Sequence, residues 1–197
     1  MRLFVSSLLV CAAAPLLLQA EATQWTIDPS HSSAQFSVRH LMVSTVRGQF
    51  GKVTGKVVYD AADLSKSSVE ATVDASAIDT RDAKRDDHLR SADFFDVAKY
   101  PTMTFKSKSI TAAGPGKLKM VGDLTMHGVT KEVTFDVEGP SPEVKLPRGA
   151  KSGATATGKI NRKDFGITWN RALDAGGVTV GDEVSITIDV ELNKVTQ

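Results

Sequence analysis

The chain has 197 residues, of which 24 are Lys or Arg and 23 are Asp or Glu, so its formal net charge is +1. This balance gives no electrostatic basis for nucleic-acid binding, which usually requires a strongly basic surface. The single cysteine is Cys11, so the chain beyond it has no disulfide, thiol nucleophile or thiolate-bound zinc. The length suits one domain with an ordinary hydrophobic core.

The N-terminal residues are organised like an export signal. Arg2 supplies a positive charge, Leu3 to Leu18 form an apolar run, and Ala20-Glu21-Ala22 offers a small-x-small cleavage site. A membrane anchor is the alternative, but the run is shorter than the roughly 20 residues that span a bilayer. The sequence therefore predicts a cleaved signal peptide over residues 1–22, a single mature domain over residues 23–197, and a periplasmic location.

Most of the remaining chain alternates between apolar and polar residues, as β-strands with one buried face do. The first clear strand places Ala34, Phe36, Val38 and His40 on one face. The pattern recurs over residues 53–59, 69–75, 103–105, 118–126, 133–137, 154–160 and 184–190. Short turn signals such as His127-Gly128 separate these segments, so neighbouring strands should be antiparallel. About eight such strands form either a closed barrel or a two-sheet sandwich, and periodicity alone does not separate the two.

One segment, Thr80 to Ser91, interrupts the alternation. Thr80 is a candidate N-cap, and Asp82 would suit the first turn of a helix. The charges of the segment predict a short and largely solvated helix. The apolar cluster that follows predicts a plug at one end of the core; it comprises Phe94, Phe95, Tyr100 and Pro101.

The predicted inward face mixes phenylalanines with small residues and flexible methionines. Ala71, Gly122, Ala156 and Gly158 leave volume that side chains do not fill, which favours a cavity over a packed core. The ligand of such a cavity should be long and apolar. An outer-membrane barrel is a less favoured alternative, because the strands lack aromatic girdles at their two ends.

No motif in the sequence supports catalysis, a cofactor or a metal site. Residues 153–159 resemble a phosphate-binding loop, but Ile160 replaces the required Ser or Thr and the segment alternates like a strand. The four histidines are scattered. Asp28, His31 and Ser32 lie too close along the chain to form a hydrolase triad, and Asp28 with Ser30 suits a turn.

Several short motifs in fixed order resemble the YceI-like proteins, which are exported, lipocalin-like barrels associated with polyisoprenoid binding. The resemblance covers nearly all of the mature chain, although residues 140–149 and 170–177 match no motif. The motifs are Asp28-Pro29-Ser30-His31-Ser32, Phe36-x-Val38-x-His40, Gly48-x-Phe50, Arg85-Asp86-x-His88-Leu89, Asp93-Phe94-Phe95-Asp96, Tyr100-Pro101, Gly122-x-Leu124-Thr125-x-His127-Gly128-Val129-Thr130-Lys131 and Arg162-x-Asp164-Phe165-Gly166.

The resemblance implies an all-β, eight-stranded antiparallel lipocalin-like barrel with a short helix near one end. Its lumen would take a long-chain isoprenoid or a similar amphiphile. We expect the protein to bind no nucleic acid and not to insert stably into a membrane. A homodimer is a further expectation. We expect the ligand to contact Phe36, Val38, Met103, Phe105, Leu124, Met126 and Phe135, with His40 at its polar end. The alternatives are a lipid-modifying periplasmic enzyme with His31 or His127 as a base, and an interaction module with a filled core.

Overall fold

The structure of the protein is a computed structural model that describes residues 22–172 and 177–196. The predicted signal peptide lies outside the described residues, except for Ala22. Among the described residues, no helix is both long and apolar enough to cross a membrane.

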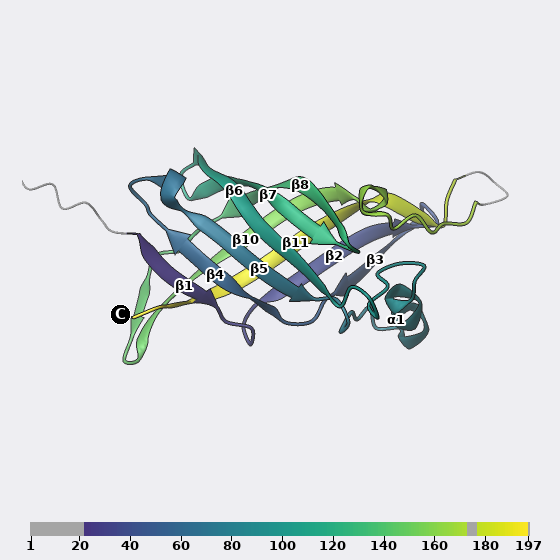
Figure 1. The fold of residues 1–197 in the computed structure, drawn as a ribbon, viewed down its shortest axis with the longest axis horizontal. Helices are drawn as coiled ribbons and strands as arrows, with labels where there is room; N and C mark the ends of the chain where they lie inside the picture. Colours follow the sequence, from purple (N-terminus) through teal and green to yellow (C-terminus); the bar gives the residue numbers. More distant parts are fainter. Residues whose placement is uncertain (1–21, 173–176, 197) are drawn as a thin grey trace, which may run out of the picture.

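Antiparallel strands make up most of the described chain, and their order in the sequence is shown by colour in Figure 1. The strands are β1 (Thr23–Ile27), β2 (Ser33–His40), β3 (Ser44–Gln49), β4 (Val53–Tyr59), β5 (Ser68–Asp74), β6 (Thr102–Gly114), β7 (Lys117–Met126), β8 (Val129–Glu138), β9 (Val144–Leu146), β10 (Gly149–Asn161) and β11 (Val180–Lys194). The helical elements are α1 (Ala83–Arg90) and two 3-10 turns, η1 (Leu64–Lys66) and η2 (Arg162–Phe165).

The sheet closes on itself through β11. One edge of β11 pairs with β10, and the other edge pairs with β2 and then with β1. Since β1 pairs with β4 and β2 pairs with β3, the strands β1 and β2 together occupy one position in the wall. The strands β3 and β4 together occupy the next position. The described residues thus form a closed eight-stranded antiparallel barrel, to which β9 adds a short extension on β10. The barrel prediction is confirmed, whereas the sequence pattern missed β1, β3 and β9.

The turn between β7 and β8 shows how local chemistry fixes the register of the sheet. His127 and Gly128 both have positive φ, at 52° and 74°, as the tightest hairpin turns require. A Cβ atom at position 128 would lie 2.6 Å from the Tyr100 ring, and the positive φ also favours glycine there. The predicted turn at His127-Gly128 is therefore confirmed, and it leads directly into ten consecutive residue pairs between β7 and β8.

The helix begins later than the sequence predicted. Asp82 is its N-cap and accepts a hydrogen bond from the backbone N–H of Arg85 at 3.1 Å, so the prediction of Thr80 as the cap was wrong. Thr80 is instead buried and donates its hydroxyl to Asp86 at 2.5 Å. Asp86 is also buried, so the helix is less solvated than its charges suggested. The Asp86 carboxylate thus binds the segment that leads into α1.

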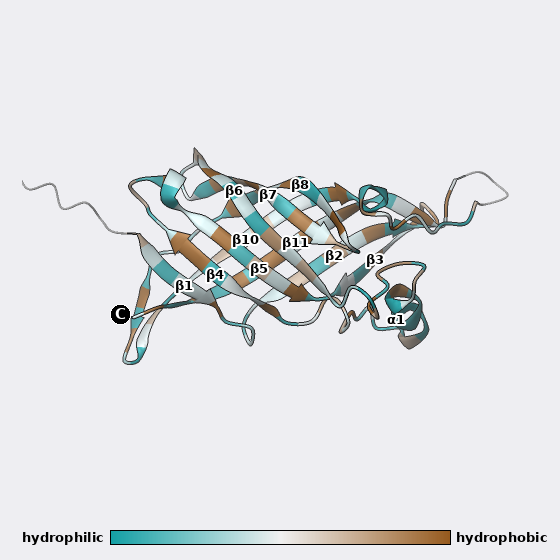
Figure 2. Cartoon of the chain, viewed as in Figure 1, coloured by the Kyte–Doolittle hydropathy of each residue, from teal (hydrophilic) through white to brown (hydrophobic). Residues whose placement is uncertain are grey.

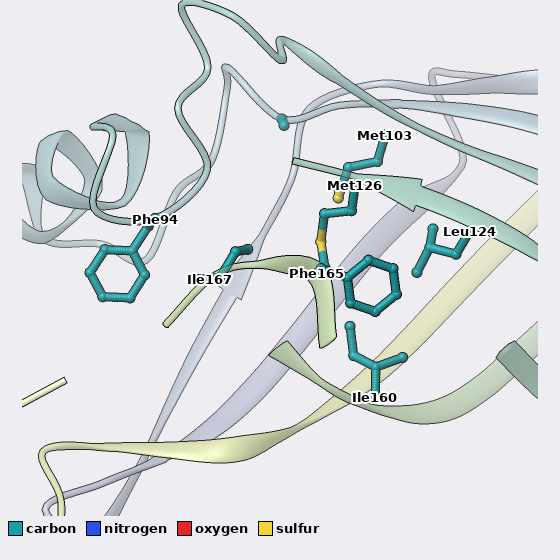
Figure 3. Close-up of a cluster of buried hydrophobic side chains, with 8 residues drawn as sticks. Phe94, Met103, Leu124, Met126, Ile160, Phe165 and Ile167 are labelled. Atoms are coloured by element: carbon teal, nitrogen blue, oxygen red, sulfur yellow. The ribbon is translucent and has the colours of Figure 1, made fainter. Parts of the chain in front are cut away.

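The core consists of apolar clusters inside the barrel, and the polar faces of the strands point outward. Apolar and polar residues alternate along the strands in Figure 2. Cross-strand ion pairs follow the outer face, for example Lys106 with Glu70 at 2.9 Å. The cluster nearest α1 surrounds Phe165, whose ring lies among Met126, Leu124 and Ile160 in Figure 3. Phe94 belongs to the same cluster, so the predicted plug packs against this end of the core.

We predict that Phe165→Ala lowers the free energy of unfolding by about 3–5 kcal/mol, because it leaves a cavity among side chains that cannot collapse into it. Phe165 is 1% exposed. Urea denaturation measures this loss. Val144→Ala is the control, since Val144 is 56% exposed and its truncation should change stability by less than about 0.5 kcal/mol. Equal effects of the two substitutions would contradict the assignment of the core.

Candidate ligand cavity

The barrel encloses a cavity of about 450 Å³ that runs along its interior. Its walls are formed by the inward, mostly apolar side chains of every strand of the barrel wall except β3. Along β11 alone, alternate residues from Val184 to Leu192 line it. At a rise of about 3.3 Å per residue, this lining extends over roughly 26 Å. The cavity is therefore long, narrow and apolar.

Seven of the eight residues expected to contact a ligand line this cavity. They are Phe36, Val38, Met103, Phe105, Leu124, Met126 and Phe135. His40 is not among the lining residues of the described chain; it lies at the end of β2, opposite Ser44 of β3 and Val180 of β11. The expected polar contact through His40 therefore stays a prediction.

Three phenylalanine rings of the lining lie over glycines of neighbouring strands. A Cβ atom added to each glycine would meet a ring carbon at 2.5–2.8 Å, which is closer than real Cβ atoms approach. We call these contacts the glycine–phenylalanine pairs: Phe36 over Gly48, Phe105 over Gly122, and Phe135 over Gly158. The sequence pattern suggested that such glycines leave unfilled volume, but they provide room for the rings to lie against the wall. The lumen between the rings stays open as a result.

The two ends of the cavity differ. At the α1 end the lining residues are Leu89, Phe94, Phe95, Ile167 and Val180, which are all buried or half-buried. At the end near β9 the lining includes three exposed residues, Ala61, Ser141 and Glu143. The cavity thus meets solvent beside β9, and we call this opening the mouth.

Arg162 secures the closed end. It is 4% exposed, and each of its N–H groups donates a hydrogen bond. Four backbone carbonyls accept, among them those of Ile167 at 2.7 Å and Gly181 at 2.9 Å, and Asp182 accepts at 3.3 Å. Burial lowers the pKa of Arg162. Its guanidinium joins the segment after η2 to the start of β11. The sequence motif that contains Arg162 did not indicate this role.

A charged cluster on the outside of the barrel explains the Asp28 motif. Asp28 accepts a hydrogen bond from the backbone N–H of Ser30 at 2.9 Å and contacts His31 Nδ1 at 3.1 Å. Lys151 lies between Asp28 and Glu191 and forms ion pairs with both. These contacts confirm the predicted turn role of Asp28. The carboxylates also lie near enough to His31 to suggest a metal site, but the Lys151 ammonium already meets their charge.

The histidines considered as bases lie away from the cavity lining. His31 is exposed on the outer surface, with 62% of its side chain accessible. His127 contacts the carbonyl of Phe165 at 3.1 Å and stacks edge-on against Tyr100. Ser32 accepts a hydrogen bond from the backbone N–H of Glu191 at 3.1 Å. Among the described residues, these groups do not face a common space that a substrate could enter.

An eight-stranded antiparallel barrel with an apolar lumen and one mouth defines the protein as a lipocalin-like barrel. The chain belongs to the YceI-like domain family, whose sequence profile matches residues 25–192. The UPF0312 protein SA2479 of Staphylococcus aureus (strain N315) is 40% identical over 172 residues, which cover 87% of this chain and 98% of that protein.

Solved structures share the fold. The Campylobacter jejuni YCEI protein is 32% identical with a TM-score of 0.66, and the match covers 80% of this chain and 90% of that chain. Burkholderia cenocepacia BcnA is 27% identical with a TM-score of 0.72 and covers 84% and 98% of the two chains. A polyisoprenoid binding domain from Saccharophagus degradans has a TM-score of 0.63 at 15% identity, a likeness in fold alone.

We predict that Asp28→Asn destabilises the protein at neutral pH and that the loss shrinks in acid. The backbone of Ser30, His31 and Lys151 hold the pKa of Asp28 far below its usual range. A carboxylate with a depressed pKa stabilises the fold above its unfolded pKa of about 3.9, and this contribution is lost as the pH falls through the folded pKa.

Thermal denaturation as a function of pH measures this effect, because the asparagine keeps the turn acceptor while it removes the charge. The same substitution in a Lys151→Met background should cost less, since that variant lacks the cation of the pair. A stability difference between the parent protein and the Asp28→Asn variant that stays constant from neutral pH to about pH 2 would contradict this role.

Proposed function

We propose that this protein is an exported binding protein that holds a long-chain isoprenoid, or a similar amphiphilic lipid, in its lumen for transport, storage or sequestration. The observation that carries the proposal is the elongated apolar cavity with one closed end and one mouth. An apolar chain that leaves water for this lumen gains about 25 cal/mol for each Å² of buried surface. The protein would therefore act by binding, and we assign it no catalytic step, metal or cofactor.

The polar end of the ligand would lie at the mouth. Thr23, Ser141, Glu143 and Ser152 line the cavity there, whereas the middle of the lumen is almost wholly apolar. At the closed end, Arg162 lines the cavity, but its donors already bond to protein acceptors. A head group therefore finds polar partners and solvent at the mouth, and the tail would extend toward Met103, Leu124 and Met126.

The choice of ligand class draws on both the cavity and the fold. The Saccharophagus degradans domain is described as polyisoprenoid binding, so a barrel of this architecture is associated with such a ligand. In this chain the support comes from its own lining, where Phe36, Phe105 and Phe135 offer ring faces and edges to a branched hydrocarbon.

The two alternatives drawn from the sequence have less support. An interaction module with a filled core does not agree with a cavity of about 450 Å³. A lipid-modifying enzyme with His31 or His127 as its base would need that histidine beside the ligand, and neither residue is part of the described lining.

We predict that Ala156→Phe abolishes binding of a long-chain polyprenol to delipidated protein, because the ring would occupy the lumen. Ala156 lines the cavity from β10, and the next residue, Thr157, is exposed on the outer face. Thr157→Phe is therefore the matched control and should bind normally. Displacement of a fluorescent fatty amphiphile measures uptake, and circular dichroism confirms folding. Normal uptake by a folded Ala156→Phe protein would contradict the lumen as the binding site.

We also predict export with removal of residues 1–22. Intact mass spectrometry of the periplasmic fraction should then give a chain that begins at Thr23. Ala20→Leu with Ala22→Leu should block cleavage, because the peptidase requires small residues at these positions. A full-length chain found only in the cytoplasm would contradict export.

A further inference from the structure

The hairpin formed by β9 and the start of β10 carries exposed apolar side chains. Val144 is 56% exposed and Leu146 is 45% exposed, and Pro147 at the turn is exposed as well. Val195, which follows β11 at the same end of the barrel, is 44% exposed. Large apolar side chains held in water on a projecting hairpin indicate a contact surface. We call residues 144–148 the β9 tip.

The charge of the β9 tip is positive. Lys145 and Arg148 are exposed, and within the described chain neither forms an ion pair or a side-chain hydrogen bond. The acidic residue next to the tip, Glu143, is already paired with Lys194 at 2.6 Å. Free cations beside exposed apolar side chains are the combination that binds the surface of an anionic bilayer.

The β9 tip is fixed next to the mouth of the cavity. Ser141 and Glu143, which precede β9, line the mouth. The backbone N–H of Ser141 donates to the carbonyl of Gly153 at 2.8 Å, and Leu146 pairs with Gly149 across the hairpin. In Figure 1 this green hairpin projects beside the C-terminus, at the end of the barrel opposite α1. A surface that the tip contacts would therefore lie close to the opening.

We propose that the β9 tip docks on the surface of an anionic lipid bilayer and sets the mouth of the barrel against it. The proposal rests on the proposed function in one respect: an apolar ligand of the lumen resides in membranes, so the mouth must meet one. Val144 and Leu146 enter the interface, and Lys145 and Arg148 contact lipid phosphates. The barrel stays outside the hydrocarbon layer, because its outer face carries charged strands such as β6 and β7.

A second copy of the chain fits the β9 tip less well. In a twofold dimer the same patch meets itself, which would bring the cations of one tip against those of the other. β9 is also only three residues long, and a short edge strand offers little backbone for pairing. The experiment below therefore treats dimerisation through this hairpin as the alternative to docking.

The opposite end of the barrel provides a matched control. Met42 and Val43, in the turn between β2 and β3, are 53% and 77% exposed. The neighbouring cation, Arg39, is already hydrogen-bonded: it donates to the carbonyl of Met42 at 2.8 Å and to Thr45 Oγ1 at 3.0 Å. This turn is thus as apolar as the β9 tip but lies away from the mouth and has no free cation on its own residues.

Sedimentation with vesicles tests the proposal. One set of vesicles contains phosphatidylcholine alone, and the other contains equal parts of phosphatidylcholine and phosphatidylglycerol. We expect binding to the anionic vesicles that weakens with salt. Val144→Ser with Leu146→Ser should lower the partition coefficient about tenfold. Lys145→Gln with Arg148→Gln should lower it at least tenfold, since each cation contributes roughly fivefold. Met42→Ser with Val43→Ser should leave it unchanged.

Two further measurements separate the possible failures. If the β9-tip variants bind vesicles like the parent protein, or if the Met42 and Val43 variant loses binding equally, docking by the β9 tip is overturned. If the β9-tip variants instead abolish a dimer seen by analytical ultracentrifugation without vesicles, the occupant is a second copy and the proposal fails. Uptake of polyprenol delivered in solvent is measured on the same proteins. If docking fails but uptake is intact, only the docking proposal is wrong. If the parent protein takes up no polyprenol, the proposed function is overturned.

Discussion

The glycine–phenylalanine pairs determine what this barrel can do. An eight-stranded barrel is so narrow that its own side chains usually fill it. In this protein, rings such as those of Phe105 and Phe135 lie in the space that Gly122 and Gly158 leave on neighbouring strands. The rings therefore cover the wall and remain out of the axis of the barrel. They pack edge-to-face at 5.5 Å, which holds both in place and leaves an apolar lumen between them and the opposite strands.

The open lumen is useful because its ends differ. At one end, α1 and the plug bury Phe94 and Ile167 in the same cluster as Phe165, and Arg162 ties the adjoining segment to β11. At the other end, polar lining residues meet solvent. A ligand with one apolar and one polar end has a single favourable orientation in such a space. The β9 tip adds a surface beside the opening at which that ligand would enter or leave.

Much of the fold could be predicted from the sequence, because strands with one buried face leave a period-2 pattern. Seven of the expected ligand contacts line the cavity for the same reason. Alternation gives the face of a residue but not its height along the strand, so it placed His40 with Phe36 although His40 lies beyond the lining. Alternation alone did not separate a closed barrel from a sandwich, because β1 and β3 are short strands that occupy the same wall positions as β2 and β4 and that the pattern missed.

Other differences arise from contacts between residues that are distant in the sequence or from competing local partners. Thr80 has the chemistry of an N-cap, but its hydroxyl is bound by Asp86, and Asp82 caps the helix instead. The glycines suggested empty volume because the rings that occupy it come from other strands. Arg162 finds carbonyl acceptors only once η2 meets the start of β11. Such contacts leave no periodic pattern in the sequence, so they could not be predicted from it.

The central claim is that the lumen holds a long apolar ligand, and native mass spectrometry of the protein purified from its own periplasm tests it most directly. We expect a complex with one bound amphiphile per chain, whose organic extraction yields a long-chain isoprenoid or a related lipid. A protein that is consistently empty, and that also fails to take up added polyprenol, would contradict the claim.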